Sequence, residues 1–356
     1  MPLQSGKTSL HELAYGITGI GCGAPTTRNP HNRHYLAGGS SSGSAAAVAA
    51  GLVPAALGTD TGGSVRIPAA VCGIVGFRPT TGRYPHGGLI RISPSRDTIG
   101  LMARDVDDIL LLDELITGEL HTITPFAAPV AALRLAIPQP SWQCLDAEVA
   151  RVTSRALNIL ERAGCVLVDT GPAIHAGLAE EWLDVAMKIP LAETPGAIAA
   201  YLRESKCDAE FDEIINDIAA PDVRTILMPL LKERIAPADY QALIAKQHNL
   251  RCAALLARRK YHTDVVIMPT TILPAAPSDI GDEVKVNGKS MSTFQAYIRN
   301  TAPSTILGVP SVTIPAGFTA GGLPVGLQMD GVPGGDTQLL MQARYCMQLL
   351  HPTLTR

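Results

Sequence analysis

The chain has 356 residues, of which 46% are apolar and 17% are charged, and its formal net charge is −3. This length fits one large domain or two ordinary ones. The apolar content excludes a disordered chain, whose composition combines low hydrophobicity with high net charge. The small negative charge gives no general reason to expect binding to nucleic acid or to an anionic membrane.

Seven cysteines are scattered from Cys22 to Cys346, and their number is odd. This pattern indicates reduced thiols rather than a disulfide framework. No apolar run approaches the length of about 18 residues that a membrane-spanning helix needs, and the first residues lack the apolar segment of a signal peptide. We therefore expect a cytoplasmic protein with no membrane partner.

Between residues 38 and 88 the chain is rich in Gly, Ser and Ala, and Asp60 is the only acidic residue of this stretch. Flexible linkers share this composition, but they do not usually contain apolar runs such as AAAVAAGLVPAAL. Ala45–Ala50 suits a helix that packs closely against its neighbours, with Gly43 and Ser44 at its start. We expect this stretch to be an ordered part of the core.

Residues 133–168 predict a strand, a helix and a second strand in succession. Leu133–Ile137 is an apolar run typical of a buried strand, and Cys165–Val168 is another strand candidate. Between them a helix is predicted to begin at Asp146 and to end at Gly164, with apolar side chains on one face. This succession is the pattern of an α/β fold.

Residues from about 180 to 260 lose the strand pattern and become helical and charged. Tyr240–Arg258 is the clearest helix, with its apolar residues on one side. Val265–Met268 and Val312–Ile314 then predict short buried strands. The expected architecture is a mixed α/β domain with a helical excursion before its last strands.

The string Gly39–Gly43 (GSSSG) matches the nucleophile elbow of α/β-hydrolases, with Ser41 as the nucleophile. That motif requires a strand running into it, and residues 33–38 (RHYLAG) predict only a poor strand. It also requires an acidic residue and a histidine later in the chain, which any chain of this size offers by chance. Ser41 therefore stays a minor alternative. No histidine has metal-binding spacing to cysteines or acidic residues, so no metal and no cofactor is predicted.

Two Gly/Ser-rich loops, residues 37–51 and 58–83, carry a stronger indication. Acyl transfer needs a nucleophile, a relay to a base, and backbone N–H donors that face the developing oxyanion. In the second loop, the glycines of Thr61–Ser64 allow a concave nest of N–H groups with the Ser64 hydroxyl at its rim. In the first loop, the Ser40 hydroxyl is small enough to bridge to Ser64. For either loop alone, the simpler interpretation is a tight turn whose serines cap helices.

Together the two loops resemble the amidase signature family, whose hallmark is GGSSGGS followed by GTDTGGSxRxPAAxxGxxGxKPT. The resemblance extends to segments before and after the hallmark and misses only the helical middle. The segments are GKTSL at 6–10, HELAYG at 11–16, RNP at 28–30, DVVIMPT at 264–270, GVP at 308–310 and GLPVGLQ at 322–328. Within the family, HELAYGIT, RIPAA and GFRPTTGR are most similar to indoleacetamide and mandelamide hydrolases.

This resemblance implies an α/β/α sandwich with a mixed central sheet flanked by helices. It implies one domain over residues 1–356, with a helical insertion at about 180–260 that lines the substrate mouth. The implied reaction converts a linear primary amide, of the aryl-acetamide type, to the carboxylic acid and ammonia. The implied partner is this small-molecule amide, and a homodimer is left open.

By the same resemblance, Ser64 is the nucleophile and Ser40 is the bridging serine that follows a cis peptide bond. Backbone amides of Thr61, Gly62, Gly63 and Ser64 form the oxyanion hole. A neutral lysine takes the proton of Ser64 through Ser40, Ser64 attacks the amide carbonyl, ammonia leaves, and water releases the acid.

Ser41, Asp60 and Arg66 flank these groups, and we expect them to support the two loops structurally.

Two positions depart from the family pattern. Ser42 stands where the family usually has glycine, which matters if that position needs a positive φ. The family's catalytic lysine lies some tens of residues before the segment Gly6–Thr8, whereas Lys7 is the only lysine before Ser40. We therefore expect an N-terminally truncated chain that lacks its base and hydrolyses amides poorly.

Two alternatives remain. One is a truncated or non-catalytic homologue that only folds, binds or oligomerises. The other, less favoured, is an amidotransferase subunit acting on charged transfer RNA, to which the composition, without a basic excess, gives no support.

Overall fold

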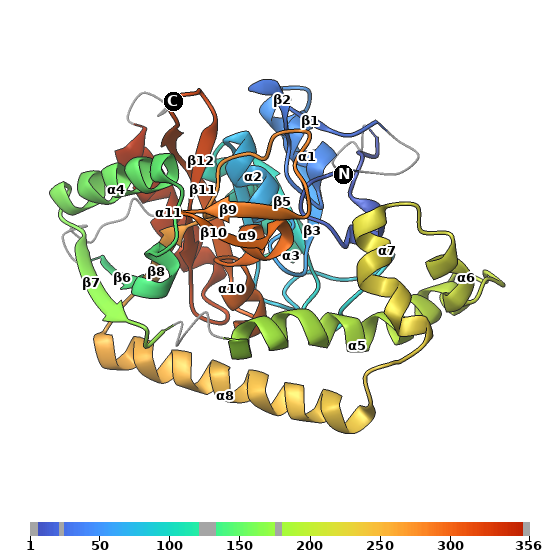
Figure 1. Cartoon of the computed structure of the whole chain (residues 1–356). Coiled ribbons are helices and arrows are strands. Elements are labelled where there is room, and N and C mark those ends of the chain that lie inside the picture. The colour runs from blue at the N-terminus through green and yellow to red at the C-terminus, as the bar shows by residue number, and fades with distance from the viewer. Residues whose placement is uncertain (1–5, 21–24, 121–132, 175–179, 352–356) are drawn as a thin grey trace.

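A computed structural model describes residues 6–20, 25–120, 133–174 and 180–351, and its centre is an eight-stranded mixed sheet (Figure 1). Across the sheet, neighbouring strands are antiparallel up to β8, and β6 is parallel to both β8 and β7. In spatial order the strands are β3 (Ala55–Asp60), β5 (Thr98–Ala103), β4 (Val75–Arg78), β11 (Ser311–Phe318), β12 (Pro324–Asp330), β8 (Val265–Pro269), β6 (Arg134–Pro138) and β7 (Val166–Gly171).

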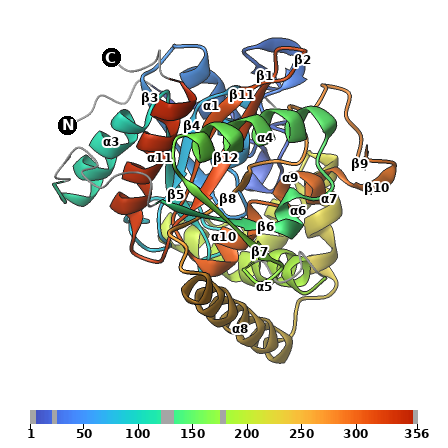
Figure 2. The same cartoon turned by 90° about the vertical axis from the view of Figure 1, so that its left-hand side faces the viewer.

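Helices cover both faces of this sheet, because successive side chains of each strand point to opposite faces. Leu101 of β5 packs on one face in a cluster with residues of α3 (Val106–Thr117), α4 (Ala147–Arg162) and α11 (Asp336–Leu350). Met102, its neighbour in β5, packs on the other face with residues of α1 (Ser42–Ala49) and α2 (Arg66–Cys72). Figure 2 shows the first group of helices beside the sheet. The expected α/β/α sandwich is confirmed.

The predicted strand–helix–strand unit is present as β6, α4 and β7. The Asp146 carboxylate caps α4 by accepting hydrogen bonds from the N–H groups of Glu148 (2.9 Å) and Val149 (3.4 Å). The helix predicted over Ala45–Ala50 is α1, and the buried strands predicted at Val265–Met268 and Val312–Ile314 are β8 and part of β11.

The expectation that residues 33–38 form a poor strand was wrong. β2 (Asn32–Leu36) pairs with β1 (Arg28–Asn29) in a separate two-stranded sheet. Its last residue also contacts a distant segment, because the Leu36 N–H donates to the Ala276 carbonyl at 2.8 Å. A second small sheet joins β9 (Glu283–Val286) to β10 (Lys289–Ser292).

Residues 180–261 are helical, as the sequence predicts. They form α5 (Glu180–Glu204), α6 (Phe211–Asn216), α7 (Pro221–Leu227), a 3₁₀ turn (Met228–Leu231) and α8 (Pro237–Tyr261). Trp182 and Val185 of α5 pack with Leu243 of α8 and with α10 (Ala302–Leu307), so α5 and α8 lie side by side along one end of the sheet (Figure 1). Within the described ranges, no helix is long and apolar enough to cross a membrane.

Candidate active site

The two Gly/Ser loops lie side by side, one leading into α1 and the other into α2. The Ser41 N–H donates to the Ser64 carbonyl at 3.2 Å, and the Ser40 carbonyl accepts from the N–H groups of His11 (3.0 Å) and Ser42 (2.9 Å). The peptide bond between Gly39 and Ser40 is cis. The fold thus brings the Ser40–Ser41 segment next to Ser64.

The Ser41 hydroxyl is fully engaged with the backbone of β3. Its oxygen accepts from the Thr59 N–H at 3.2 Å, and its O–H donates to the Thr59 carbonyl at 3.3 Å. A hydroxyl held in this way is not presented to a substrate. Ser41 therefore fits a supporting role better than that of an α/β-hydrolase nucleophile.

Every carbonyl from Thr61 to Ser64 is anchored to the protein by a hydrogen bond. The donors are the Arg96 guanidinium to Thr61 (3.1 Å), the Thr301 hydroxyl to Gly62 (2.6 Å), the Ile67 N–H to Gly63 (2.7 Å) and the Ser41 N–H to Ser64 (3.2 Å). In a trans peptide the N–H of the next residue points away from the carbonyl, so each anchor also directs the following N–H. The N–H groups of Gly62, Gly63 and Ser64 donate to no other residue of the described chain.

Gly63 must be glycine in this arrangement. Its φ is +135°, and a Cβ built on it would lie 2.3 Å from the Thr301 hydroxyl oxygen. The loop therefore combines a conformation that only glycine adopts readily with the close approach of Thr301. Ser42, by contrast, begins α1 without a positive φ, so the departure from the usual glycine does not disturb this turn.

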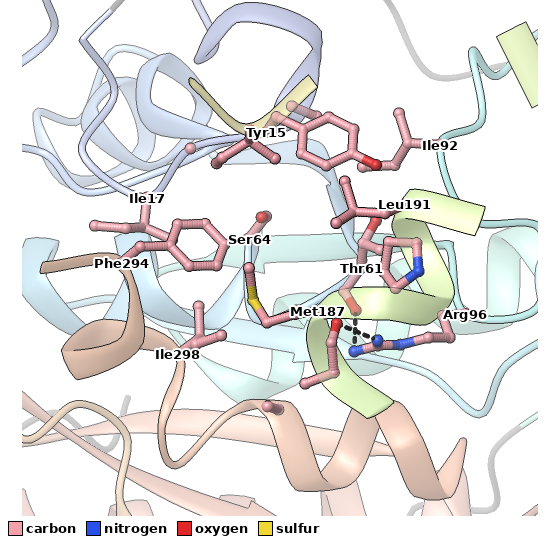
Figure 3. Close-up of a pocket in the computed structure, with 17 residues that line it drawn as sticks. Tyr15, Ile17, Thr61, Ser64, Ile92, Arg96, Met187, Leu191, Phe294 and Ile298 are labelled. Atoms are coloured by element: carbon pink, nitrogen blue, oxygen red, sulfur yellow. Dashed lines mark hydrogen bonds between the residues drawn. The ribbon is translucent and has the colours of Figure 1, made fainter. Parts of the chain in front are cut away.

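Ser64 belongs to the lining of a mainly apolar pocket of about 590 Å³, which includes its open mouth. Figure 3 shows Ser64 among Phe294, Met187 and Ile17. Thr61 and Gly62 also line the pocket, whereas Gly63 packs against Thr301. Further apolar lining comes from Tyr15, Ile92, Leu191 and Ile298.

Ser40 is buried, with 1% of its surface exposed, and its hydroxyl has no hydrogen-bond partner among the described residues. A buried hydroxyl without a partner costs free energy. All eight lysines of the sequence lie in described segments, and Lys7, the one nearest in sequence, is exposed. None of them bonds to Ser40, so the described chain shows no base for it.

Asp60 and Arg66 form an ion pair with both side chains fully buried. The Asp60 carboxylate accepts from Arg66 Nε and Nη2, each at 3.0 Å, and from Arg78 Nη1 at 3.2 Å. Burial by itself would raise the pKa of Asp60, but the guanidinium groups of Arg66 and Arg78 outweigh it and lower that pKa to about 2. The remaining Arg66 donors reach Ser304, Ser311, Gln328 and the Thr301 carbonyl.

Sequence reasoning missed Arg96, Asp97 and Thr301. The Asp97 carboxylate accepts from the Thr61 hydroxyl at 2.5 Å and from the N–H groups of Ile92 and Ser93. A charged pair, Arg96-Asp97, inside a mostly uncharged stretch was the available signal. Thr301 carried no signal, because it lies 239 residues from the carbonyl that it binds. No cluster of three or more metal-ligating side chains occurs in the described ranges.

Comparison with known proteins relates the chain to amidases. The family model named Amidase matches residues 3–340. The chain is 38% identical to an indoleacetamide hydrolase of Agrobacterium vitis, covering 95% of this chain and 72% of that protein. It is 39% identical to a mandelamide hydrolase of Pseudomonas putida, covering 99% and 71%.

Solved structures of related enzymes have a similar fold. A crystal structure of an amidase has a TM-score of 0.83 at 31% identity, covering 96% of this chain and 73% of that one. The structure of a 6-aminohexanoate cyclic dimer hydrolase complexed with substrate has a TM-score of 0.80 at 25% identity, covering 97% and 74%.

Replacement of Asp60 by Asn tests the buried ion pair. The folded-state pKa of about 2 lies below the ordinary 3.8, so the carboxylate adds stability above pH 4 that is lost as the pH falls towards 2. We expect Asp60→Asn to lower the free energy of unfolding at pH 7 by about 3–5 kcal/mol. We also expect it to flatten the change between pH 4 and pH 2, as measured by urea unfolding at stepped pH.

The matched control is Asp212→Asn, because Asp212 pairs with Arg234 at 3.5 Å on the surface. An exposed pair contributes about 0–1 kcal/mol. The same acid dependence in the parent chain and in Asp60→Asn would contradict the assignment.

Proposed function

Because the chain belongs to the amidase family and is an amidohydrolase, we propose that it hydrolyses primary amides of the aryl-acetamide type with Ser64 as the nucleophile. One observation carries this proposal above the others. Ser64 lines an apolar pocket beside a loop whose carbonyls are all anchored and whose N–H groups at Gly62, Gly63 and Ser64 donate to no described residue. Such preorganised donors are what an acyl-transfer transition state requires.

The pocket lining supports the aryl-acetamide class. Phe294, Met187 and Leu191 offer apolar and aromatic surface to the acyl side chain. Among the described residues of the lining, Arg96 is the one with a charged side chain, and both of its Nη atoms donate to the protein. Two relatives are named for aryl-substituted acetamides, indoleacetamide and mandelamide.

In the proposed mechanism, Ser64 Oγ attacks the amide carbonyl carbon and its proton passes to the Ser40 hydroxyl, which in turn releases a proton to a base. The negative charge on the carbonyl oxygen is stabilised by the loop N–H groups of Thr61, Gly62, Gly63 and Ser64, of which the last three donate to no described residue. Collapse of the tetrahedral intermediate expels ammonia, with a proton returned to the leaving nitrogen, and leaves an acyl-Ser64 ester. Water then attacks this ester, and the acid and the Ser64 hydroxyl are released.

We further propose that residues 1–356 belong to one amidase domain in which the helical segment supplies a pocket wall. Ala186, Met187, Pro190 and Leu191 of α5 all line the pocket. In this proposal Ser41, Asp60 and Arg66 support the loops and touch no substrate.

The competing proposal is a non-catalytic homologue. It is favoured by a single observation, namely that the buried Ser40 hydroxyl has no partner among the described residues. General-base assistance typically contributes about 10²–10⁴-fold, so a chain without a base for Ser40 would turn over slowly while still folding and binding amides.

Labelling by a fluorophosphonate probe tests the nucleophile. We expect Ser64→Ala to abolish labelling, because the probe reacts with the serine beside the oxyanion donors. Ser41→Ala is the control and should leave labelling largely intact, because the Ser41 hydroxyl is bound to Thr59. Mass spectrometry of the labelled peptide identifies the site, and a label on Ser41 would support the α/β-hydrolase alternative.

Shortening Phe294 tests the substrate class. Removing an aromatic wall costs about 1–3 kcal/mol for a ligand that fills the pocket. We therefore expect Phe294→Ala to lower kcat/KM for phenylacetamide by about 10–100-fold and that for acetamide by less than about threefold. Ammonia release measures both. Phe318→Ala, at a side chain that is 52% exposed, is the control. Equal losses for the two amides would exclude Phe294 from the acyl site.

Lys7 provides a test of the base. Because Lys7 is exposed and does not bond to Ser40, we expect Lys7→Met to change the rate of probe labelling by less than about threefold. A loss of about 10²-fold or more is the size expected for a general base. Such a loss would identify Lys7 as the base and contradict the expectation that Lys7 does not serve Ser40.

A further inference from the structure

We propose that Arg96 and Thr301 are positioning residues that aim the oxyanion donors of the Ser64 loop. In addition, Arg96 holds this loop at a fixed place relative to the pocket wall. The inference rests on the proposed function, because it assigns roles in stabilising the same transition state. Neither side chain is given contact with the reacting atoms.

Arg96 and Asp97 both bind Thr61, the first residue of the loop. The Arg96 side chain is almost completely buried, and its Nη2 donates to the Thr61 carbonyl at 3.1 Å. Asp97 accepts from the Thr61 hydroxyl at 2.5 Å. The Arg96 carbonyl is held in turn by Arg78 Nη2 at 2.7 Å. With Thr61 fixed at its carbonyl and its side chain, the Gly62 N–H has one available direction, away from Arg96.

Thr301 does the same for the next peptide. Its hydroxyl donates to the Gly62 carbonyl at 2.6 Å. Because this peptide is trans, the Gly63 N–H points away from Thr301. The Thr301 carbonyl accepts from Arg66 Nη2 at 3.1 Å. This hydrogen bond connects Thr301 directly to the buried Asp60–Arg66 pair. The direction of the Gly63 N–H therefore depends on that pair through Thr301.

Arg96 also holds the helix that forms the pocket wall, and a proline explains why it can. In a regular α-helix the carbonyl of Ala186 would accept from the N–H of residue 190, but Pro190 has no N–H. Arg96 Nη1 donates to that carbonyl at 2.7 Å (Figure 3). Ala186 and Pro190 both line the pocket. The Arg96 guanidinium therefore connects the helix of the pocket wall to the oxyanion loop.

Two substitutions separate positioning from stability. Arg96→Lys keeps the charge, but a single ammonium nitrogen lacks the planar fork that reaches the Thr61 and Ala186 carbonyls together. Thr301→Val keeps the shape and removes the hydroxyl. Loss of an oxyanion donor costs about 10²–10³-fold in kcat. For a misdirected donor we expect about 10–100-fold, with KM changed by less than about threefold.

The matched controls are buried residues remote from the pocket. Arg258→Lys alters a guanidinium that binds the carbonyls of Asp330, Gly331 and Asp264. Thr153→Val removes a buried hydroxyl whose hydrogen bond is to the Val149 carbonyl of its own helix. Both are expected to lower thermal stability while leaving kcat and KM within about threefold of the parent chain.

The experiment measures hydrolysis of p-nitrophenyl phenylacetate by residues 1–356, with kcat expressed per fluorophosphonate-reactive site. It also compares the inhibition constants of benzylboronic acid, which places an oxyanion in the hole, and of phenylacetic acid. Positioning roles predict a 10–100-fold weaker boronate in Arg96→Lys and Thr301→Val, with the affinity for phenylacetic acid nearly unchanged. Thr301→Val carries the test if Arg96→Lys does not fold.

Values of kcat and boronate affinity equal to those of the Arg258→Lys and Thr153→Val controls would overturn the inference and leave the proposed function in place. Failure of the parent chain to release p-nitrophenolate or to react with the probe would overturn the proposed function, and this inference with it.

Discussion

The buried Asp60–Arg66 pair is the constraint on which the site depends. A guanidinium removed from water must satisfy its donors within the protein. Those of Arg66 reach Asp60, Ser304, Ser311, Gln328 and the Thr301 carbonyl. The end of β3, the start of α2, α10 and two central strands must therefore converge on one side chain. Breaking the pair would leave charge unpaired inside the core, which costs far more than the net contribution of the pair itself.

This convergence explains how a short glycine-rich loop is held rigid. Glycines give the backbone its freedom, and that freedom has to be removed if the N–H groups are to face a developing charge without reorganisation. In this loop the backbone freedom is removed by hydrogen bonds to each carbonyl from Thr61 to Ser64. The donors are directed by their own peptide planes and stay free to bind. A loop anchored through its N–H groups would have the opposite polarity and would repel an oxyanion.

The sequence predicts the parts of this arrangement that are local. The β6–α4–β7 unit, the helix at Ala45 and the two Gly/Ser loops all follow from spacing within a few tens of residues. Arg96 and Thr301 do not, because their contacts join segments that only the finished fold brings together. At residues 33–38, β2 is paired with the neighbouring strand β1, and its last residue, Leu36, also donates to the distant Ala276 carbonyl. Propensity describes a segment alone, whereas a distant partner can decide whether it becomes a strand.

Pro190 of α5 shows how the proposed acyl pocket and the proposed oxyanion loop are kept apart and yet connected. Most of the described pocket lining comes from α5, α9 (Thr293–Ile298) and the segment around Tyr15, none of which belongs to the central sheet. The Thr61–Ser64 loop, by contrast, is connected to the central strands through Thr301 and Arg66. Side chains of the pocket can therefore be replaced to fit a different amide without moving the N–H groups of the loop. This requires that the pocket and the loop stay at a fixed separation. Pro190 frees a helix carbonyl for Arg96, and that bond supplies the fixed separation.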